Sequence, residues 1–130
     1  MATAKPHNTD TRRAALRTRT RENQTAARAR RSIARAAVKV RTTARSLATH
    51  VIATGAAAED IKGAAQALSK VAKKLGIKGR RIRIRRAVDG FRARATTGYR
   101  YTRAQVAAIA DAYKPRKAEY KVIRAALVAA

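Results

Sequence analysis

Apolar side chains recur at helical spacing in the first half of the chain. Residues 11–54 contain no glycine or proline and are rich in alanine and arginine, which are good helix formers. Steps of four and three connect Ile33, Ala37, Val40, Ala44, Leu47 and Val51. This spacing forms one apolar stripe and predicts a continuous helix that ends at Gly55. We expect the stripe to pack within the chain; the alternative is a homodimer, a coiled coil through residues 33–51.

The second half of the chain contains three further helical patterns. Glu59 and Asp60 place negative charge at the start of a helix, where acids offset the helix dipole. Thr102 and Gln105 have the spacing of a capping box and predict another helix start. A last helix is expected after Pro115. The expected buried residues of the three helices are Ile61, Ala65, Leu68, Ala72 and Leu75, then Val106, Ile109 and Tyr113, then Tyr120, Ile123 and Leu127.

Between these helices lies a segment with strand-like alternation. Residues 91–94 and 99–101 flank Thr96-Thr97-Gly98, a pattern typical of a short hairpin with a Thr-Gly turn. Tyr99 and Tyr101 could stack on bases, but we expect at least one of them to pack against the helix of Val106.

The cations around Pro115 fit a phosphate clamp or a solvated turn equally well; they are Lys114, Arg116 and Lys117.

Net charge narrows the range of functions. The chain has 32 Lys and Arg against 7 Asp and Glu, a formal net charge of +25. Such an excess is self-repulsive, so we expect a polyanion to neutralise it. Arginine binds phosphate in a bidentate fork, and it outnumbers lysine here. The basic stretches lack the large apolar anchors of membrane-surface helices, and no apolar run approaches the ~18 residues of a membrane span. The composition therefore predicts binding to nucleic acid and not to a membrane.

Catalytic and metal-binding chemistry finds little support. The chain has no cysteine, which excludes disulfides and thiolate metal sites. His7 and His50 are far apart in sequence, and we expect both imidazoles to be solvated. The sequence contains none of the common hydrolase, metalloprotease or phosphate-loop motifs. We therefore expect no enzymatic activity, no cofactor and no metal.

Residues 68–82, LSKVAKKLGIKGRRI, resemble the helix-turn-helix of bacterial and phage DNA-binding proteins. Val71 and Leu75 would bury the first helix, Gly76 would adopt the positive φ of the turn, and Ile82 would seat the second helix. The resemblance covers roughly residues 61–113 and implies a recognition helix from about Gly79 to Val88, followed by a wing. The pattern departs from the family at Arg85 and Arg86, where apolar residues are usual.

An alternative interpretation makes the same arginines part of a β-ribbon. Ile82 and Ile84 alternate with arginines, and Asp89-Gly90 is a strong two-residue hairpin turn. Pairing Val88 with Phe91 would place Ile82, Ile84, Ala93 and Ala95 on one face and Arg81, Arg83, Arg85, Arg92 and Arg94 on the other. Both interpretations make residues 80–94 a phosphate-binding surface.

Residues 20–94 also resemble, more weakly, the three-helix primary-binding protein of the bacterial small ribosomal subunit. That resemblance rests on a long basic helix, an alanine-rich second helix ending in Lys-Lys-Leu-Gly-Ile, and a basic third segment. It implies a ribosome-associated protein that binds structured RNA. The C-terminal part of this chain has no counterpart in that family.

Together these patterns predict a mainly α protein with three parts. Residues 1–10 form a disordered tail, residues 11–58 a basic helical arm, and residues 59–130 a helix-turn-helix-like domain with a short β-hairpin. We expect cytoplasmic, nucleoid-associated binding to duplex DNA, with RNA as the alternative. The expected nucleic-acid-binding residues are Arg80, Arg81, Arg83, Arg85, Arg86, Arg92, Arg94 and Arg100, with Arg28, Arg31 and Arg35 on the arm.

Overall fold

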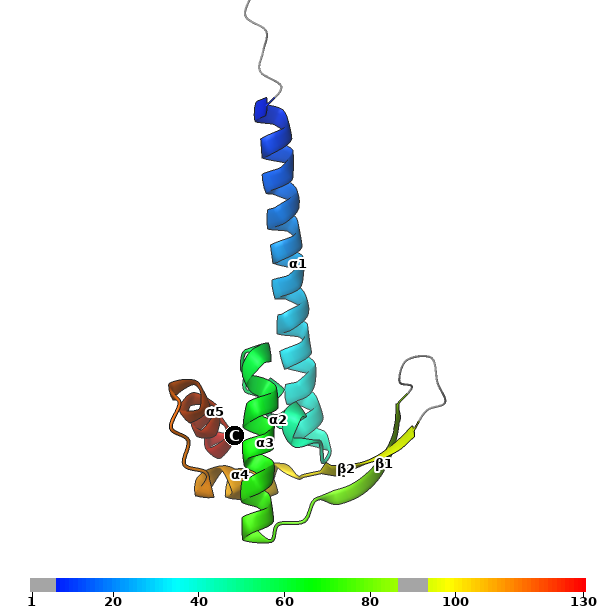
Figure 1. The fold of residues 1–130 in the computed structure, drawn as a ribbon, viewed down its shortest axis with the longest axis vertical. Coiled ribbons are helices and arrows are strands. Elements are labelled where there is room, and N and C mark those ends of the chain that lie inside the picture. Colours follow the sequence, from blue (N-terminus) through cyan, green and yellow to red (C-terminus); the bar gives the residue numbers. More distant parts are fainter. Residues whose placement is uncertain (1–6, 87–93) are drawn as a thin grey trace, which may run out of the picture. The chain divides into compact units, whose positions relative to one another are not determined.

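The protein is mainly helical, with one two-stranded antiparallel sheet among the residues that the structure describes (Figure 1). The computed structural model describes residues 7–86 and 94–130. The elements are α1 (His7–Thr42), α2 (Leu47–Ala53), α3 (Ala58–Leu75), β1 (Arg80–Arg86), β2 (Arg94–Arg100), α4 (Arg103–Ala112) and α5 (Ala118–Ala129). The long basic N-terminal helix and the small hairpin confirm the predicted fold class.

The chain divides into two compact units, Met1–Ser32 and Ile33–Ala130. The first unit contributes only the N-terminal part of α1, whose side chains from residue 9 onward are exposed except for that of Ala27. Helix α1 already begins at His7, inside the segment for which we expected disorder. Threonine hydroxyls donate to carbonyls one turn earlier, as Thr20 does to Leu16 at 2.8 Å. This part of the helix is stabilised locally, because it buries almost no apolar surface of its own.

The continuous helix predicted up to Gly55 is wrong, because α1 ends at Thr42 and a separate short helix, α2, begins at Leu47. Ser46 caps α2, and its hydroxyl accepts a hydrogen bond from the Thr49 amide. Arg45 and Tyr101 exchange two backbone hydrogen bonds of 3.0 and 2.8 Å, forming an isolated β-bridge. Helical periodicity cannot reveal this bridge, because its two residues are far apart in the chain.

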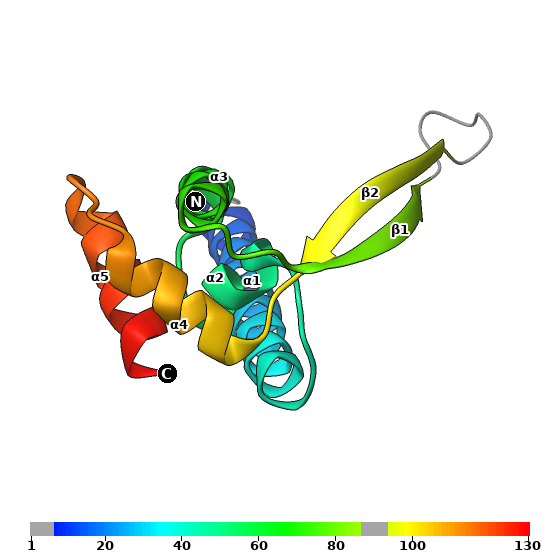
Figure 2. The same ribbon diagram turned by 90° about the horizontal axis from the view of Figure 1, so that it is seen from below.

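The core of the second unit lies among α2, α3, α4 and α5 (Figure 2). Its largest fully buried side chains are Leu68, Ile109, Val51 and Val106. Leu47 and Val51 of the predicted stripe are both buried in this core, which fits packing within the chain; a homodimer through residues 33–51 stays a prediction. The buried positions predicted for the last two helices are confirmed: Val106, Ile109, Ile123 and Leu127 are buried, and Tyr113 and Tyr120 pack against the core.

The expected capping box at the start of α4 is present. The Thr102 hydroxyl accepts from the Gln105 amide at 3.3 Å, and the Gln105 side chain accepts from the Thr102 amide at 2.9 Å. This places Arg103 at the first residue of α4.

Helix α3 ends as the sequence predicts, but no second helix follows. Gly76 has φ +70°, and the amides of Gly76 and Ile77 donate to the carbonyls of Lys73 and Ala72, a Schellman motif. The recognition helix predicted over residues 79–88 is wrong, since β1 occupies residues 80–86. A helix there would have required two arginines at buried positions. Leu75 is also not buried, because the helix that would have covered it does not exist; it is 48% exposed.

Strands β1 and β2 form the ribbon of the alternative interpretation, in a different register. Ile82 pairs with Gly98, Ile84 with Thr96 and Arg86 with Arg94. Thr97 and Gly98 therefore lie inside β2, and the predicted Thr-Gly turn is wrong. Ala95 pairs with Arg85 and so faces away from Ile82 and Ile84, because a shift of one residue exchanges the two faces of a strand. The predicted turn residues Val88 to Phe91, with Arg92 and Ala93, lie outside the described residues.

Candidate nucleic-acid interface

The hairpin of β1 and β2 gathers most of the predicted arginines. The seven residues of β1 read RRIRIRR and those of β2 read RATTGYR, with no acidic residue in either strand. The β-branched isoleucines favour an extended backbone, and their alternation with arginine suits a strand with two different faces. Figures 1 and 2 show the hairpin extending away from helices α2 to α5. The charge is thus carried on a projecting element.

One face of the hairpin carries a row of exposed cations. Arg81, Arg83 and Arg85 lie on the same face and are all exposed. Alternate residues of a strand are about 6.7 Å apart, so the row covers roughly 13 Å. Thr97 and Tyr99, their partners on β2, share this face. The row is long enough to follow several phosphates.

The opposite face is more apolar at its centre. Ile82 and Ile84 are partly buried there, and Gly98 lies beneath them. A Cβ atom on Gly98 would come within 2.8 Å of Ile84 Cδ1, so the glycine leaves the room that this isoleucine fills. The packed isoleucines stabilise the hairpin while the arginines stay solvated.

A hollow of about 580 Å³ lies between the hairpin and the segment that follows α1. Its basic lining comes from both strands, and Thr43 and Ala44 form the other wall. The four lining arginines are Arg80, Arg83, Arg85 and Arg100. The sequence predicted these arginines as binding residues. It did not predict the wall at Thr43, because the apolar stripe predicted an unbroken helix there.

The hairpin charges have no counterion within the described part of the chain. The only ion pair there joins Arg124 to Asp111, with 3.9 Å between nitrogen and oxygen. Arg80, Arg81, Arg83 and Arg85 are exposed and solvated, and their mutual repulsion would be relieved by an external anion.

The other predicted arginines lie on α1, at the ends of the two strands or outside the described residues. Arg28 and Arg31 are exposed on α1 in the first unit, and Arg35 is exposed on α1 in the second but does not line the hollow. The pairing places Arg86 opposite Arg94 in the backbone. Arg92 lies outside the described residues.

The two tyrosines of the hairpin end have different roles. Tyr101 is 8% exposed and packs with Val106 and Ile109, which confirms that at least one of the pair is structural. Tyr99 is 50% exposed and remains available for stacking. The cations around Pro115 are exposed, and Lys117 lies 5.6 Å from the ring centre of Tyr120.

The prediction that His50 is solvated is wrong. It is 3% exposed, and its Nε2 lies 2.9 Å from the carbonyl oxygen of Tyr101. Because a carbonyl only accepts, Nε2 donates this bond. Burial lowers the pKa of His50 below 6.5, the positive charge of Arg103 lowers it further, and backbone hydrogen bonding at Tyr101 opposes the shift. Neutral His50 thus anchors α2 to the start of α4.

Stability should therefore depend on this histidine in mildly acidic solution. The pKa of His50 is lower in the folded than in the unfolded chain, so the stabilisation is complete above the unfolded pKa of 6.5 and falls as the pH drops through the folded value. We expect the melting temperature to be lower at pH 5 than at pH 8. His50→Gln keeps an N–H donor that does not titrate, so the variant should show a smaller decrease. The same decrease in both proteins would contradict this role.

Among the described residues, no group of three or more His, Asp or Glu side chains could hold a metal ion. No helix in the described segments combines the length and the hydropathy needed to cross a bilayer.

Comparison with known proteins adds no further constraint. No protein-family model, curated protein or solved structure matches the chain.

Proposed function

We propose that the chain is a non-catalytic nucleic-acid-binding protein whose β-hairpin contacts the phosphate backbone of duplex DNA. The observation that carries this proposal is the arginine hairpin: cations exposed on a projecting ribbon, without acidic residues in its strands. Phosphate oxygens are the natural partners of such guanidinium groups, which bind them in bidentate fashion.

The two-stranded shape of the hairpin favours DNA over double-stranded RNA as its ligand. The major groove of B-form DNA is about 12 Å wide and admits a two-stranded ribbon, whereas side chains cannot read the deep, narrow major groove of A-form RNA. The row of Arg81, Arg83 and Arg85 would face the groove or its edges. Tyr99, on the same face, is available for contact with a sugar or base.

Helix α1 would add affinity without sequence preference. Its exposed arginines, such as Arg28 and Arg31, carry charge over a long helical surface with few apolar side chains. Contacts of this kind position a protein on DNA but do not read its sequence. A nucleoid or packaging role is therefore as consistent with the arrangement as a regulatory one.

Competition binding tests the proposal. A labelled 20-base-pair DNA duplex is displaced by unlabelled DNA, or by double-stranded RNA of the same length, at ~0.2 M salt, where backbone attraction alone is weak. We expect DNA to compete better, and log affinity to fall with log salt at a slope of roughly −6 or steeper. A slope near −1 would show that the charge is not used on a backbone. Better competition by RNA would contradict the proposed DNA binding and support the alternative, binding to structured RNA.

A further inference from the structure

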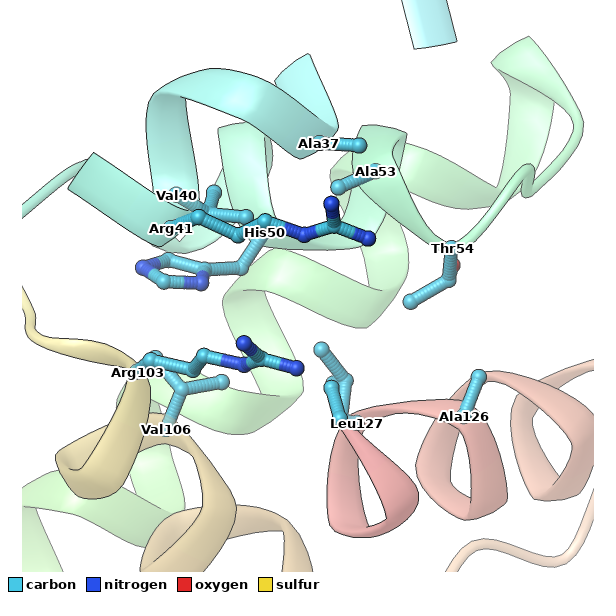
Figure 3. Close-up of a pocket in the computed structure, with 11 residues that line it drawn as sticks. Ala37, Val40, Arg41, His50, Ala53, Thr54, Arg103, Val106, Ala126 and Leu127 are labelled. Atoms are coloured by element: carbon cyan, nitrogen blue, oxygen red, sulfur yellow. The ribbon is translucent and has the colours of Figure 1, made fainter. Parts of the chain in front are cut away.

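A second cluster of cations lies apart from the hairpin, around a cavity of about 260 Å³. Arg41 from the last turn of α1 and Arg103 from the first residue of α4 both line it. Figure 3 shows the two side chains extending along opposite sides of the same space, beside the ring of His50. The pairing depends on the tertiary fold, since the two arginines come from distant parts of the chain.

Arg41 and Arg103 are both exposed, and neither guanidinium has a hydrogen bond or an ion pair with a described residue. No Asp or Glu side chain lines the cavity, but Ala130, which carries the terminal carboxylate of the sequence given, does. Arg124 shows the contrast, because it donates to the carbonyl of Ala110 at 3.0 Å and pairs with Asp111. Two unpaired like charges at one cavity raise its electrostatic potential.

The start of α4 increases this potential. The N-terminus of a helix carries a partial positive charge, so a cation at the first residue is unfavourable there. Helix α4 nevertheless begins with Arg103 and has no acidic residue in its first turn. The position of Arg103 therefore has no explanation in the stability of its own helix, whereas an anion in the cavity would make it favourable.

Other residues that line the cavity indicate the chemistry of the rest of the ligand. Val40, Ala53, Val106 and Leu127 provide apolar walls, and the volume exceeds that of an isolated small anion. A phosphate monoester carries a charge of about −1.5 to −2 at pH 7 and three acceptor oxygens, which matches two guanidinium groups, whereas a backbone diester carries only about one negative charge. An organic group attached to the phosphate would cover the apolar walls.

We propose that this cavity binds a phosphate monoester, with Arg41 and Arg103 holding the phosphate and the apolar walls covering part of the attached organic group. The proposal does not rest on the function of the hairpin, whose expected ligand is a diester. The monoester has two possible sources, a free nucleotide and the 5′-terminal phosphate of a nucleic-acid strand, and the experiment separates them.

Titration of the full chain with adenosine 5′-monophosphate at ~0.2 M salt tests the proposal. Calorimetry gives the dissociation constant, and the NMR signal of His50 reports the site. We expect saturable binding that shifts the signal of His50, and no binding of adenosine. An unshifted His50 signal, or no saturation up to ~10 mM nucleotide, would overturn the proposal.

Paired variants make the test specific. Arg41→Ala with Arg103→Ala should raise the dissociation constant at least about tenfold, the equivalent of ~1.4 kcal/mol. Lys73→Ala with Lys74→Ala removes the same charge from the exposed end of α3 and should leave the constant within about twofold. An equal loss in the control pair would overturn the site. The double variant Arg41→Lys with Arg103→Lys keeps the charge without the planar guanidinium fork. Its dissociation constant should lie between those of the parent protein and the double alanine variant.

A second arm identifies the source of the phosphate. Hexathymidylate with a 5′-phosphate is compared with the same strand ending in a 5′-hydroxyl. If the phosphorylated strand binds more tightly, and the Arg41 and Arg103 double alanine variant abolishes that difference, the site takes a strand end. If adenosine 5′-monophosphate binds more tightly than adenosine but the two strands bind equally, the site takes a free nucleotide. If neither difference is found, the proposal fails.

Discussion

Replacing Arg81, Arg83 and Arg85 by alanine is expected to weaken binding to duplex DNA by roughly a hundredfold or more at ~0.1 M salt. Each phosphate contact contributes about −0.9 to the slope of log affinity against log salt, so the loss of three contacts flattens the slope by about 2.7. The three side chains are exposed on one face of the hairpin, and their removal takes nothing from the core. Fluorescence anisotropy across a salt series measures affinity and slope together.

The matched control removes three cations from another exposed place. The triple alanine variant at Lys70, Lys73 and Lys74 of α3 changes the net charge by the same amount, outside the hairpin. We expect less than about a tenfold loss from it, because it alters only the long-range field, which salt screens. Equal losses in the two variants would show that net charge binds the DNA and that the hairpin has no special part in it.

Leu68→Ala is expected to lower the free energy of unfolding by about 2–5 kcal/mol, as buried leucine truncations do. Leu68 is 1% exposed and lies in the centre of the core formed by α2 to α5. Chemical denaturation followed by circular dichroism gives the difference from the parent protein.

Leu75→Ala is the control for this prediction. Leu75 occupies the same predicted helix face but is 48% exposed, so its truncation should cost less than about 1 kcal/mol. If a helix-turn-helix packed over the end of α3, truncation of Leu75 would lower the free energy of unfolding as much as truncation of Leu68. Similar costs for the two variants would therefore contradict the strand that follows α3.

Positions whose environment depends on nearby residues could be predicted from the sequence. The capping box of Thr102 and Gln105, the left-handed Gly76 and the buried face of α5 all follow from spacings of a few residues. Local hydrogen bonds and helical periodicity decide such features. The predicted arginines of residues 80–85 are likewise exposed as expected, because a charged side chain stays in water in either conformation.

Features that depend on distant partners could not be predicted. The break after Thr42 depends on the bridge between Arg45 and Tyr101, and the burial of His50 depends on the carbonyl of Tyr101. The register of the hairpin differs by one residue from the one that the Asp-Gly turn predicted, and this difference alone moves Ala95 to the other face. The convergence of Arg41 and Arg103 has no signal in the sequence, because it arises only when the end of α1 and the start of α4 line the same cavity.

The hairpin strands contain arginine but no lysine, and this choice fixes how the charge can be controlled. A guanidinium stays protonated throughout the physiological pH range, so the hairpin keeps its charge where histidine or a perturbed lysine would lose it. Acetylation removes the charge of lysine side chains and would act on Lys62, Lys70, Lys73 and Lys74 of α3 while leaving both strands unchanged. A cell could thus reduce the charge of the helical body by acetylation without altering the ribbon; only arginine-directed chemistry or a competing polyanion would reach it.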